Sequence, residues 1–250
     1  KNHQKQQLML SEFDARREAL GQPSLTELDS AATYSTSRLT RGDNASSLIY
    51  ACAYADFLSI NRENFDLVGV AGNSMGWYIA LACAGALDTH RGFEVVNTMG
   101  TLMQDALIGG QLLYPYVDEN WVEIPDKRDQ LMALTHRIPD LYLSIHLGGM
   151  IVFAGTEKAL KTCEQSLEPI QDRFPMRLHN HAAFHSPLQQ PISAIAKQQL
   201  PPHLFRQPTL PLIDGRGHIW QPQASNQADL WDYTLEQQVV TPFDFLASVR

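Results

Sequence analysis

The sequence has little positive charge and no long apolar run. Nineteen Lys and Arg residues stand against 27 Asp and Glu, which gives a formal net charge of −8. A protein that holds a phosphate backbone needs a basic excess, so nucleic acid is not expected as a partner. The longest apolar stretches, such as residues 79–87, are well short of the roughly 20 residues that a membrane span requires. No membrane association is therefore expected.

Cysteine is also scarce. The three cysteines, Cys52, Cys83 and Cys163, are widely spaced and form no CxxC pair. An odd number of isolated cysteines in apolar or helical surroundings indicates reduced, buried thiols. The polar start KNHQKQQ has no signal-peptide pattern, so we expect a cytoplasmic protein.

The sequence does contain enough apolar residues for one sizeable core, because 44% of its 250 residues are hydrophobic. Helix and strand patterns alternate, which is typical of an α/β fold. We expect a hydrolase-like core, a short parallel sheet flanked by helices, built from residues 1–108 and 179–250. Within it, residues 109–178 follow the order β-α-β-β-α-β, which predicts an inserted ferredoxin-like subdomain. The patterns of the core predict helices over 11–21, 44–60, 75–88, 92–107, 187–200 and 227–239, and strands over 65–72 and 209–215.

A nucleophile-elbow pattern, G-x-S-x-G, lies at Gly72-Asn73-Ser74-Met75-Gly76. Small residues permit a tight strand-to-helix turn that lifts the serine hydroxyl clear of the sheet. The amide of Met75, at the start of the next helix, can then face a developing oxyanion. Ser74 is the candidate nucleophile, and a tightly packed structural turn is the alternative.

A serine nucleophile needs a base, and His185 is the strongest candidate among nine histidines. It lies at a strand-to-helix boundary, and Pro187 can open the next helix. A capping or core histidine is the alternative. His179, His181 and His185 also form an H-x-H-x3-H pattern, but no cysteine or acidic residue completes a zinc set nearby, so no metal is expected.

Several segments, in order across about residues 44–245, resemble the malonyl-CoA:acyl carrier protein transacylases and polyketide-synthase acyltransferase domains. GNSMGWYIALACAGALD resembles their GHSxGE stretch, and MGTLMQDA resembles the helix that follows it. GGMIVFAGTEKAL resembles the PGQVVIAG strand and helix of their ferredoxin-like insert. AAFHSPLQQP resembles their catalytic-histidine segment. PTLPLID and LEQQVVTPFDF resemble their last core strand and QxxxPVxW helix end.

The resemblance implies that Ser74 takes an acyl group from CoA with His185 as base. The backbone carbonyl of Gln238 would hold the imidazole, and Met75 would supply one oxyanion amide; an ordinary exposed helix-end glutamine is the alternative for Gln238. A second thiol, the phosphopantetheine of an acyl carrier protein or synthase module, would then take the acyl group. No cofactor is implied beyond acyl-CoA as substrate.

Three departures from the family concern the substrate. Met99 stands where malonyl-selective members carry an arginine that clamps the free carboxylate, so an uncharged acyl group is expected. The alternative is that some other arginine, such as Arg91 or Arg177, has taken over this role. Asn73 replaces the usual histidine and Trp77 the usual glutamate, and both are expected beside the substrate, with Trp77 either lining an apolar acyl pocket or covering the helix start. Phe184, in AAFH, favours a short or unbranched chain.

The family's N-terminal FPGQGSQ strand, which gives the second oxyanion amide, and its C-terminal EVGPG strand have no counterpart here. We expect a sequence trimmed at both ends. The alternative is a member that has lost one oxyanion donor, which typically slows a reaction about 100- to 1000-fold.

Three other functions remain open from the sequence. The same Ser74–His185 pair would serve an acyl hydrolase that edits non-malonyl chains. A patatin-like dyad of Ser74 with Asp214 is a second possibility, and a non-catalytic domain that only binds a carrier protein is a third. Because carrier proteins are acidic, a basic patch that includes Arg177 or Lys197 is expected.

Overall fold

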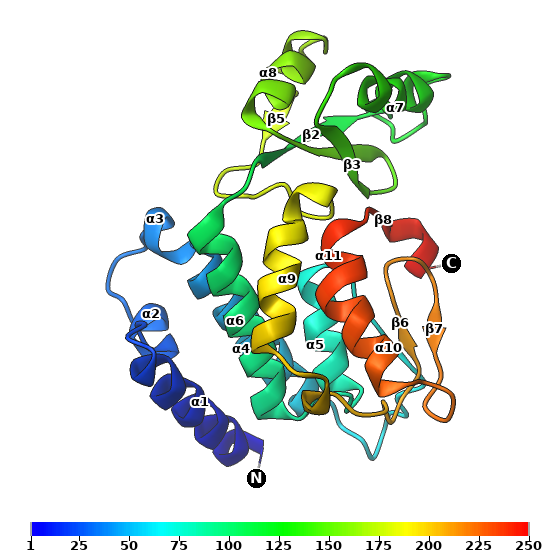
Figure 1. The fold of residues 1–250 in the computed structure, drawn as a ribbon. Coiled ribbons are helices and arrows are strands. Elements are labelled where there is room, and N and C mark those ends of the chain that lie inside the picture. Colours follow the sequence, from blue (N-terminus) through cyan, green and yellow to red (C-terminus); the bar gives the residue numbers. More distant parts are fainter. Residues whose placement is uncertain (1, 250) are drawn as a thin grey trace.

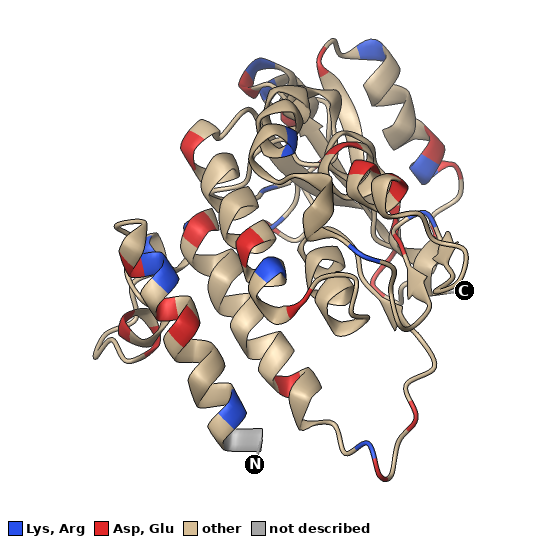
Figure 2. Cartoon of the chain, turned by 60° about the horizontal axis from the view of Figure 1, so that its bottom comes forward, with Lys and Arg blue, Asp and Glu red and all other residues tan. Residues whose placement is uncertain are grey.

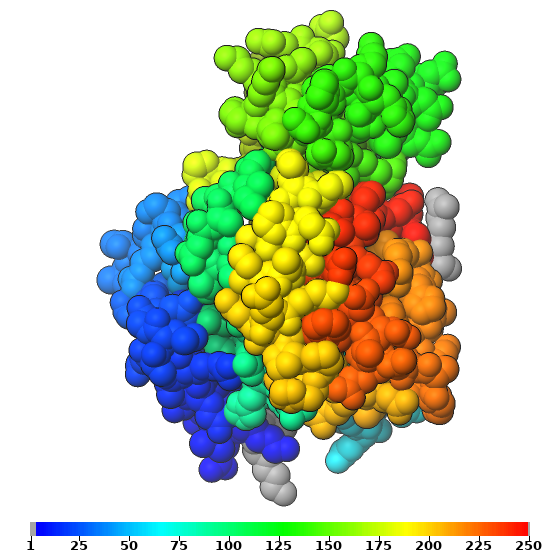
Figure 3. Space-filling model, viewed as in Figure 1, coloured from blue at the N-terminus to red at the C-terminus, as the bar shows by residue number. Residues whose placement is uncertain are grey.

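The computed structural model describes residues 2–249. Figure 1 shows a larger helical part with a small sheet and, above it, a smaller part built from a second sheet and two helices. In the space-filling view the smaller part forms a separate lobe on top of the core (Figure 3). The helices are α1 (Asn2–Ala19), α2 (Leu25–Asp29), α3 (Thr36–Leu39), α4 (Gly42–Ser59), α5 (Met75–Cys83), α6 (Thr89–Ala106), α7 (Lys127–Arg137), α8 (Glu157–Gln165), α9 (Gln190–Gln199), α10 (Gln227–Asp232) and α11 (Gln238–Val240). No helix among the residues described is long and apolar enough to cross a membrane.

The core sheet is small, with strands of two residues each. Strand β1 (Val70–Ala71) runs parallel to β6 (Leu212–Ile213), and β6 pairs antiparallel with β7 (Ile219–Trp220). Helices α4, α5, α6 and α9 build most of the core around it (Figure 1). The α/β class predicted from the sequence is therefore confirmed.

Helices α4 and α6 cross with their backbones close together, and glycine at the contact makes this possible. A Cβ on Gly100 would lie 2.8 Å from the carbonyl oxygen of Gly42. Arg17 of α1 is fully buried beside this crossing and donates to Asn97 of α6 and Asn44 of α4. Because these acceptors satisfy the guanidinium, a buried charge is tolerated there and ties three helices together.

The smaller lobe has the predicted order of elements. Strand β2 (Gly110–Pro115) is followed by α7, β3 (Leu141–His146), β4 (Met150–Gly155), α8 and β5 (Met176–Arg177). The sheet order is β5-β2-β4-β3 with antiparallel neighbours, and β8 (Phe243–Asp244) of the core chain adds to β3 in parallel. Leu112, Phe153 and Leu160 are among the buried residues of its own core. The exact division at residues 108/109 and 178/179 stays a prediction.

Several predicted elements differ in extent. The strand predicted over 65–72 is reduced to β1, and the side chains of Phe65 and Val68 are 63% and 85% exposed, because no strand within residues 2–249 pairs with the free edge of β1. Ser11 and Asn44 are not helix starts, since α1 and α4 both begin earlier. The strand predicted over 209–215 is likewise short.

The last predicted helix, 227–239, is interrupted, and the burial predicted for the cysteines holds only in part. A π-helical turn (Tyr233–Gln237) separates α10 from α11. Cys163 is buried as predicted, but Cys52 is exposed and Cys83 is partly exposed. Burial raises the pKa of the Cys83 and Cys163 thiols to about 12, so both remain protonated at neutral pH.

Candidate active site

Ser74 lies on the sharp turn between β1 and α5. Its backbone has φ 56° and ψ −125°, a conformation that is rare for a non-glycine residue and is found at functional turns. A Cβ on Gly72 would lie 2.2 Å from the carbonyl oxygen of Gly76, so Gly72 must be glycine for the turn to close. Gly76 has open space where its Cβ would be. The structure therefore contains the elbow that the sequence pattern predicts.

Helix α5 begins directly after this serine. Ser74 is its N-cap residue, and Met75 is the first helical residue. The amides of Gly76 and Trp77 bond back to the carbonyls of Asn73 and Ser74 in the turn. The first amides of a helix lack intrahelical acceptors, so the Met75 N–H is available for a negative charge that develops beside Ser74.

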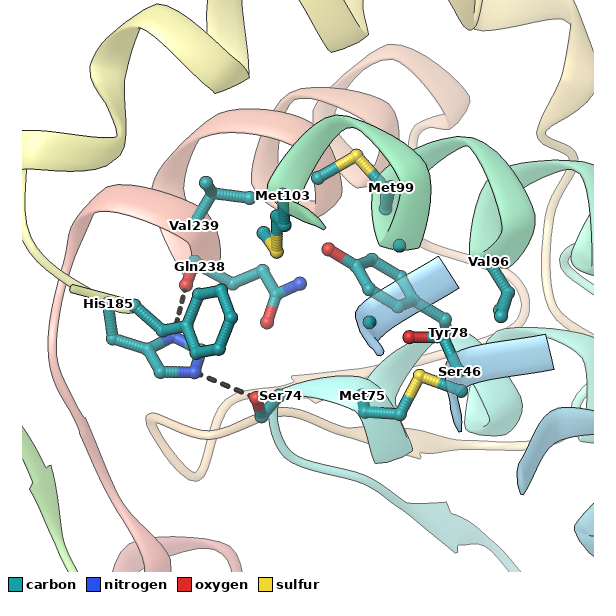
Figure 4. A pocket seen from close by; sticks show the side chains of 13 residues that line it. Ser46, Ser74, Met75, Tyr78, Val96, Met99, Met103, His185, Gln238 and Val239 are labelled. Carbon is teal, nitrogen blue, oxygen red and sulfur yellow. Dashed lines mark hydrogen bonds between the residues drawn. The ribbon is translucent and has the colours of Figure 1, made fainter. Parts of the chain in front are cut away.

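His185 lies within hydrogen-bond distance of the serine. Its Nε2 is 2.8 Å from Ser74 Oγ, and its Nδ1 is 2.7 Å from the backbone oxygen of Gln238 (Figure 4). A carbonyl oxygen only accepts, so Nδ1 carries the proton, and Nε2 accepts from the serine hydroxyl. This is the tautomer that a general base for Ser74 requires.

Burial keeps this imidazole neutral. His185 is 4% exposed, and the edge-on ring of Phe243 lies 4.8 Å from it, centroid to centroid. Desolvation lowers the pKa of His185 to about 4, and the hydrogen bond to Gln238 opposes this shift only in part. At neutral pH the ring is therefore unprotonated and can take a proton.

The break in the C-terminal helix places the Gln238 carbonyl. The π-helical turn ends at Gln237, and α11 stops at Val240. The last carbonyls of a helix have no intrahelical donor, so the Gln238 oxygen can accept from His185. Gln238 is buried, so it is not an ordinary exposed helix-end residue. Its side-chain amide donates to the carbonyl of Thr234, one turn earlier.

A cavity of about 110 Å³ opens beside Ser74 and His185. We call it the Ser74 cavity; it is lined by Gly42, Ser46, Ser74, Met75, Tyr78, Val96, Met99, Gly100, Met103, Phe184, His185, Gln238 and Val239. Figure 4 shows the methionine, valine and tyrosine side chains gathered around the serine. None of the described residues that line it is Lys, Arg, Asp or Glu, so its surface is apolar with a few neutral polar groups.

Met99 belongs to this cavity and no arginine replaces it there. Met99 is 1% exposed. Arg91 bonds to Asp88 and to the carbonyls of residues 203 and 204, and Arg177 bonds to Glu157 and Glu164 on the smaller lobe. Neither arginine lines the Ser74 cavity. The alternative in which one of them clamps a carboxylate there is therefore wrong.

Phe184 lines the Ser74 cavity, whereas Asn73 and Trp77 line a second, much smaller hollow that also borders Ser74. The indole of Trp77 is buried, packs edge-on against Tyr233 and donates to Thr234. The Asn73 amide donates to Ser248, and its buried oxygen has no partner among the described residues. Trp77 therefore does not line the Ser74 cavity, because the helix turns most of its ring into the core.

The alternative sites from the sequence are not assembled. Asp214 is fully buried and bonds to Arg216 and Trp220, whereas the Ser74 hydroxyl hydrogen-bonds to His185, so Ser74 and Asp214 do not form a dyad. His181 bonds to Gln111. Across residues 2–249, no three His, Cys, Asp or Glu side chains gather as a metal site.

Arg177 and Lys197, the residues expected in a basic patch, are both paired with acidic side chains. Lys197 bonds to Asp232 and Glu236, and Arg177 is paired with two glutamates. Lys and Arg alternate with Asp and Glu across the molecule in Figure 2. Neither Arg177 nor Lys197 is thus a free cation for an acidic partner.

Comparison with known proteins identifies the fold. No family model matches the chain. The malonyl-CoA:acyl carrier protein transacylase of Helicobacter pylori superposes with a TM-score of 0.76 at 19% identity, covering 97% of this chain and 75% of that one. The acyltransferase domain of an iterative polyketide synthase in enediyne biosynthesis superposes with a TM-score of 0.65 at 22% identity, covering 84% of this chain and 53% of that one. The chain has the malonyl-CoA:acyl carrier protein transacylase fold.

A curated sequence relative is much longer than this chain. It is a component of the phenolphthiocerol/phthiocerol polyketide synthase of Mycobacterium tuberculosis, and it is 28% identical over 171 residues. The match covers 68% of this chain and 9% of that synthase component. The resemblance stated from the sequence is thus supported, and the transacylase fold accounts for the elbow, the helix after it and the inserted lobe.

Sequence reasoning missed most of the cavity wall of this transacylase fold. Val96, Gly100 and Met103 share one face of α6 with Met99, at helical spacings of three and four residues. Ser46 follows Gly42 by four residues on α4. Once Met99 had been singled out, this spacing would have identified its neighbours. The cavity residues on α4 could not be found in this way, because the sequence around them does not show which helix packs against α6.

Proposed function

We propose that this protein is an acyltransferase that moves a short, uncharged acyl group from CoA, through an ester on Ser74, to the phosphopantetheine thiol of an acyl carrier protein. The observation that carries the proposal is the Ser74–His185–Gln238 hydrogen-bond chain at the mouth of an uncharged cavity. The transacylase fold supports it.

In the first half-reaction Ser74 Oγ attacks the thioester carbonyl carbon, and His185 Nε2 takes the hydroxyl proton. The carbonyl oxygen becomes an oxyanion, which the Met75 amide stabilises by a hydrogen bond. When the tetrahedral intermediate collapses, the C–S bond breaks, and the leaving thiol receives the proton from His185. The Gln238 carbonyl keeps the imidazole oriented while it is charged.

The second half-reaction reverses these steps with a new thiol. The phosphopantetheine sulfur attacks the acyl-Ser74 ester, and His185 takes its proton. The C–O bond to Ser74 breaks, and the same proton returns to the serine oxygen. Because one site serves both thiols in turn, the kinetics are ping-pong.

The size and lining of the Ser74 cavity favour a short chain without a carboxylate. An apolar cavity of about 150 Å³ holds the six carbons of benzene, so 110 Å³ accommodates about four carbons. A malonyl carboxylate in this cavity would face Met99 and Met103 with no cation to pair it, and burying an unpaired charge is unfavourable by several kcal/mol.

The test is a transfer assay with butyryl-CoA and a phosphopantetheinylated acyl carrier protein. We expect butyryl-carrier to accumulate with the wild type, Ser74→Ala to abolish it, and His185→Ala to leave only a slow residual rate of acylation. Release of butyrate without carrier loading would replace the transferase by the hydrolase function. Loading at the wild-type rate by Ser74→Ala would overturn the proposed nucleophile.

A further inference from the structure

The segment that carries His185 has a strained backbone. His185 has φ 56° and so lies in the left-handed region, which few non-glycine residues adopt. Such a conformation persists only where its surroundings hold it. Residues 178–186 form no helix or strand of their own. The position of the imidazole therefore depends on contacts made by this segment with other elements.

Hydrogen bonds from several elements hold the residues just before His185. The amide of Ala183 donates to the carbonyl of Ile108, and Ser186 Oγ donates to the Ala183 carbonyl. The carbonyl of Phe184 accepts from Ser144 Oγ at 2.7 Å. Since the Phe184 carbonyl belongs to the peptide bond that joins it to His185, the Ser144 bond acts closest to the imidazole.

Ser144 reaches this carbonyl from a different part of the molecule, strand β3 of the smaller lobe. It occupies an irregularity in the β3–β4 ladder, where the register shifts between Leu143 and Ile145. An extra residue of this kind redirects a side chain, and such bulges are frequent beside active sites. Ser144 is fully buried, so its hydroxyl is not in contact with water.

Two more side chains continue the hydrogen bonds behind Ser144. Its one hydrogen goes to the Phe184 carbonyl, so its oxygen accepts from Gln111 Nε2 at 2.8 Å. Gln111 Oε1 then faces His181 Nδ1 at 2.8 Å, and the histidine donates. All the donors point one way, toward the peptide before His185, and such chains strengthen each bond in them.

We infer that Ser144 is a positioning residue for His185, supported by Gln111 and His181. By fixing the Phe184 carbonyl, the bulge serine keeps the imidazole Nε2 at 2.8 Å from Ser74 Oγ. The inference rests on the proposed role of His185 as base. It gives the smaller lobe a part in the chemistry, since the lobe supplies both Ser144 and Gln111.

The test measures the rate of acyl-Ser74 formation in single turnover at several butyryl-CoA concentrations. Ser144→Ala should lower the maximal rate about 10- to 100-fold, because a small misplacement of a catalytic group has effects of this size. The concentration giving half the maximal rate should stay the same. Ser144→Thr keeps the hydroxyl and should recover most of the rate. If Ser144→Ala does not fold, Gln111→Met removes the support for Ser144 and should slow the reaction in the same way.

Tyr114→Phe is the matched control. Tyr114 lies in the same sheet, is fully buried, and donates its hydroxyl to the carbonyl of Glu168 at 2.7 Å, away from His185. It should lower the melting temperature and leave the acylation rate unchanged. If Tyr114→Phe slows acylation as much as Ser144→Ala does, Ser144 acts only through general stability and the inference is overturned.

A His185→Ala background separates the two proposals. There, Ser144→Ala should cause no further loss, because the serine acts through the imidazole. A further loss of the same factor would overturn the inference while leaving the function intact. If His185→Ala alone acylates as fast as the wild type, the proposed function itself fails.

Discussion

His185 should remain an active base far below the pH at which an ordinary histidine is protonated. Desolvation lowers its pKa to about 4, whereas an unperturbed histidine has a pKa of about 6.5. A histidine that is buried neutral loses its proton-accepting form only as pH falls through the lower value. The acid limb of the acylation rate should therefore lie near pH 4.

The size of the effect follows from the two pKa values. At pH 5 about nine-tenths of the imidazole is neutral with a pKa of about 4, against about 3% with a pKa of 6.5. The acylation rate at pH 5 should thus be about 30 times that of an enzyme with an ordinary histidine. Between pH 5 and 7, titration of His185 should change the acylation rate by only about one-tenth.

The assay is quenched single-turnover acylation from butyryl-CoA between pH 3.5 and 8, followed by intact mass. Far-UV circular dichroism at each pH controls for unfolding. This control is needed because below about pH 6.5 the histidine binds a proton in the unfolded state but not in the folded state, which favours unfolding. A midpoint near pH 6.5 in a protein that stays folded would refute the account of a desolvated base.

Three substitutions test the rest of the site. Met99→Arg should raise the rate of acylation by malonyl-CoA about 10- to 100-fold, which is the range of one charged hydrogen bond, and should lower the rate with butyryl-CoA. Met99→Leu is the control and should gain no malonyl activity. Both variants are checked by parallel measurements of the acyl adduct. Gly72→Ala should lower the acylation rate by about 100-fold or more, because its Cβ would lie 2.2 Å from the Gly76 carbonyl oxygen and the elbow would have to shift. An unchanged rate would contradict the assignment of the turn. Trp77→Phe should lower the free energy of unfolding by about 1–3 kcal/mol in urea titration and leave the acyl preference unchanged, because the indole bonds to Thr234 in the core.

The elements with strong local patterns were predictable from the sequence. The order of strands and helices over residues 110–177 follows from alternating apolar runs and turn residues, and Gly72 with Ser74 indicated the elbow. The Ser74–His185 pair joins residues 111 positions apart, and it could be predicted only because the AAFHSP segment resembles a known family.

Long-range packing explains what the sequence could not predict. Local pattern favours a strand over residues 65–72, but only Val70 and Ala71 pair with a neighbouring strand, β6, and residues 65–69 have no strand partner among the described residues. Trp77 looked like a cavity residue from its place beside the elbow, yet the helical rotation between Ser74 and position 77 directs it into the core. Ser144 gave no signal at all, because its role depends on a bulge and on a carbonyl 40 residues away.

The most direct test of the central claim is the intact mass of the protein after exposure to acetyl-, propionyl-, butyryl-, hexanoyl- and malonyl-CoA, each compared with Ser74→Ala. The account predicts a single acyl adduct that maps to Ser74, forms fastest with the short uncharged chains, and is absent from Ser74→Ala. Absence of any adduct with all five thioesters, or fastest modification by malonyl-CoA, would contradict it.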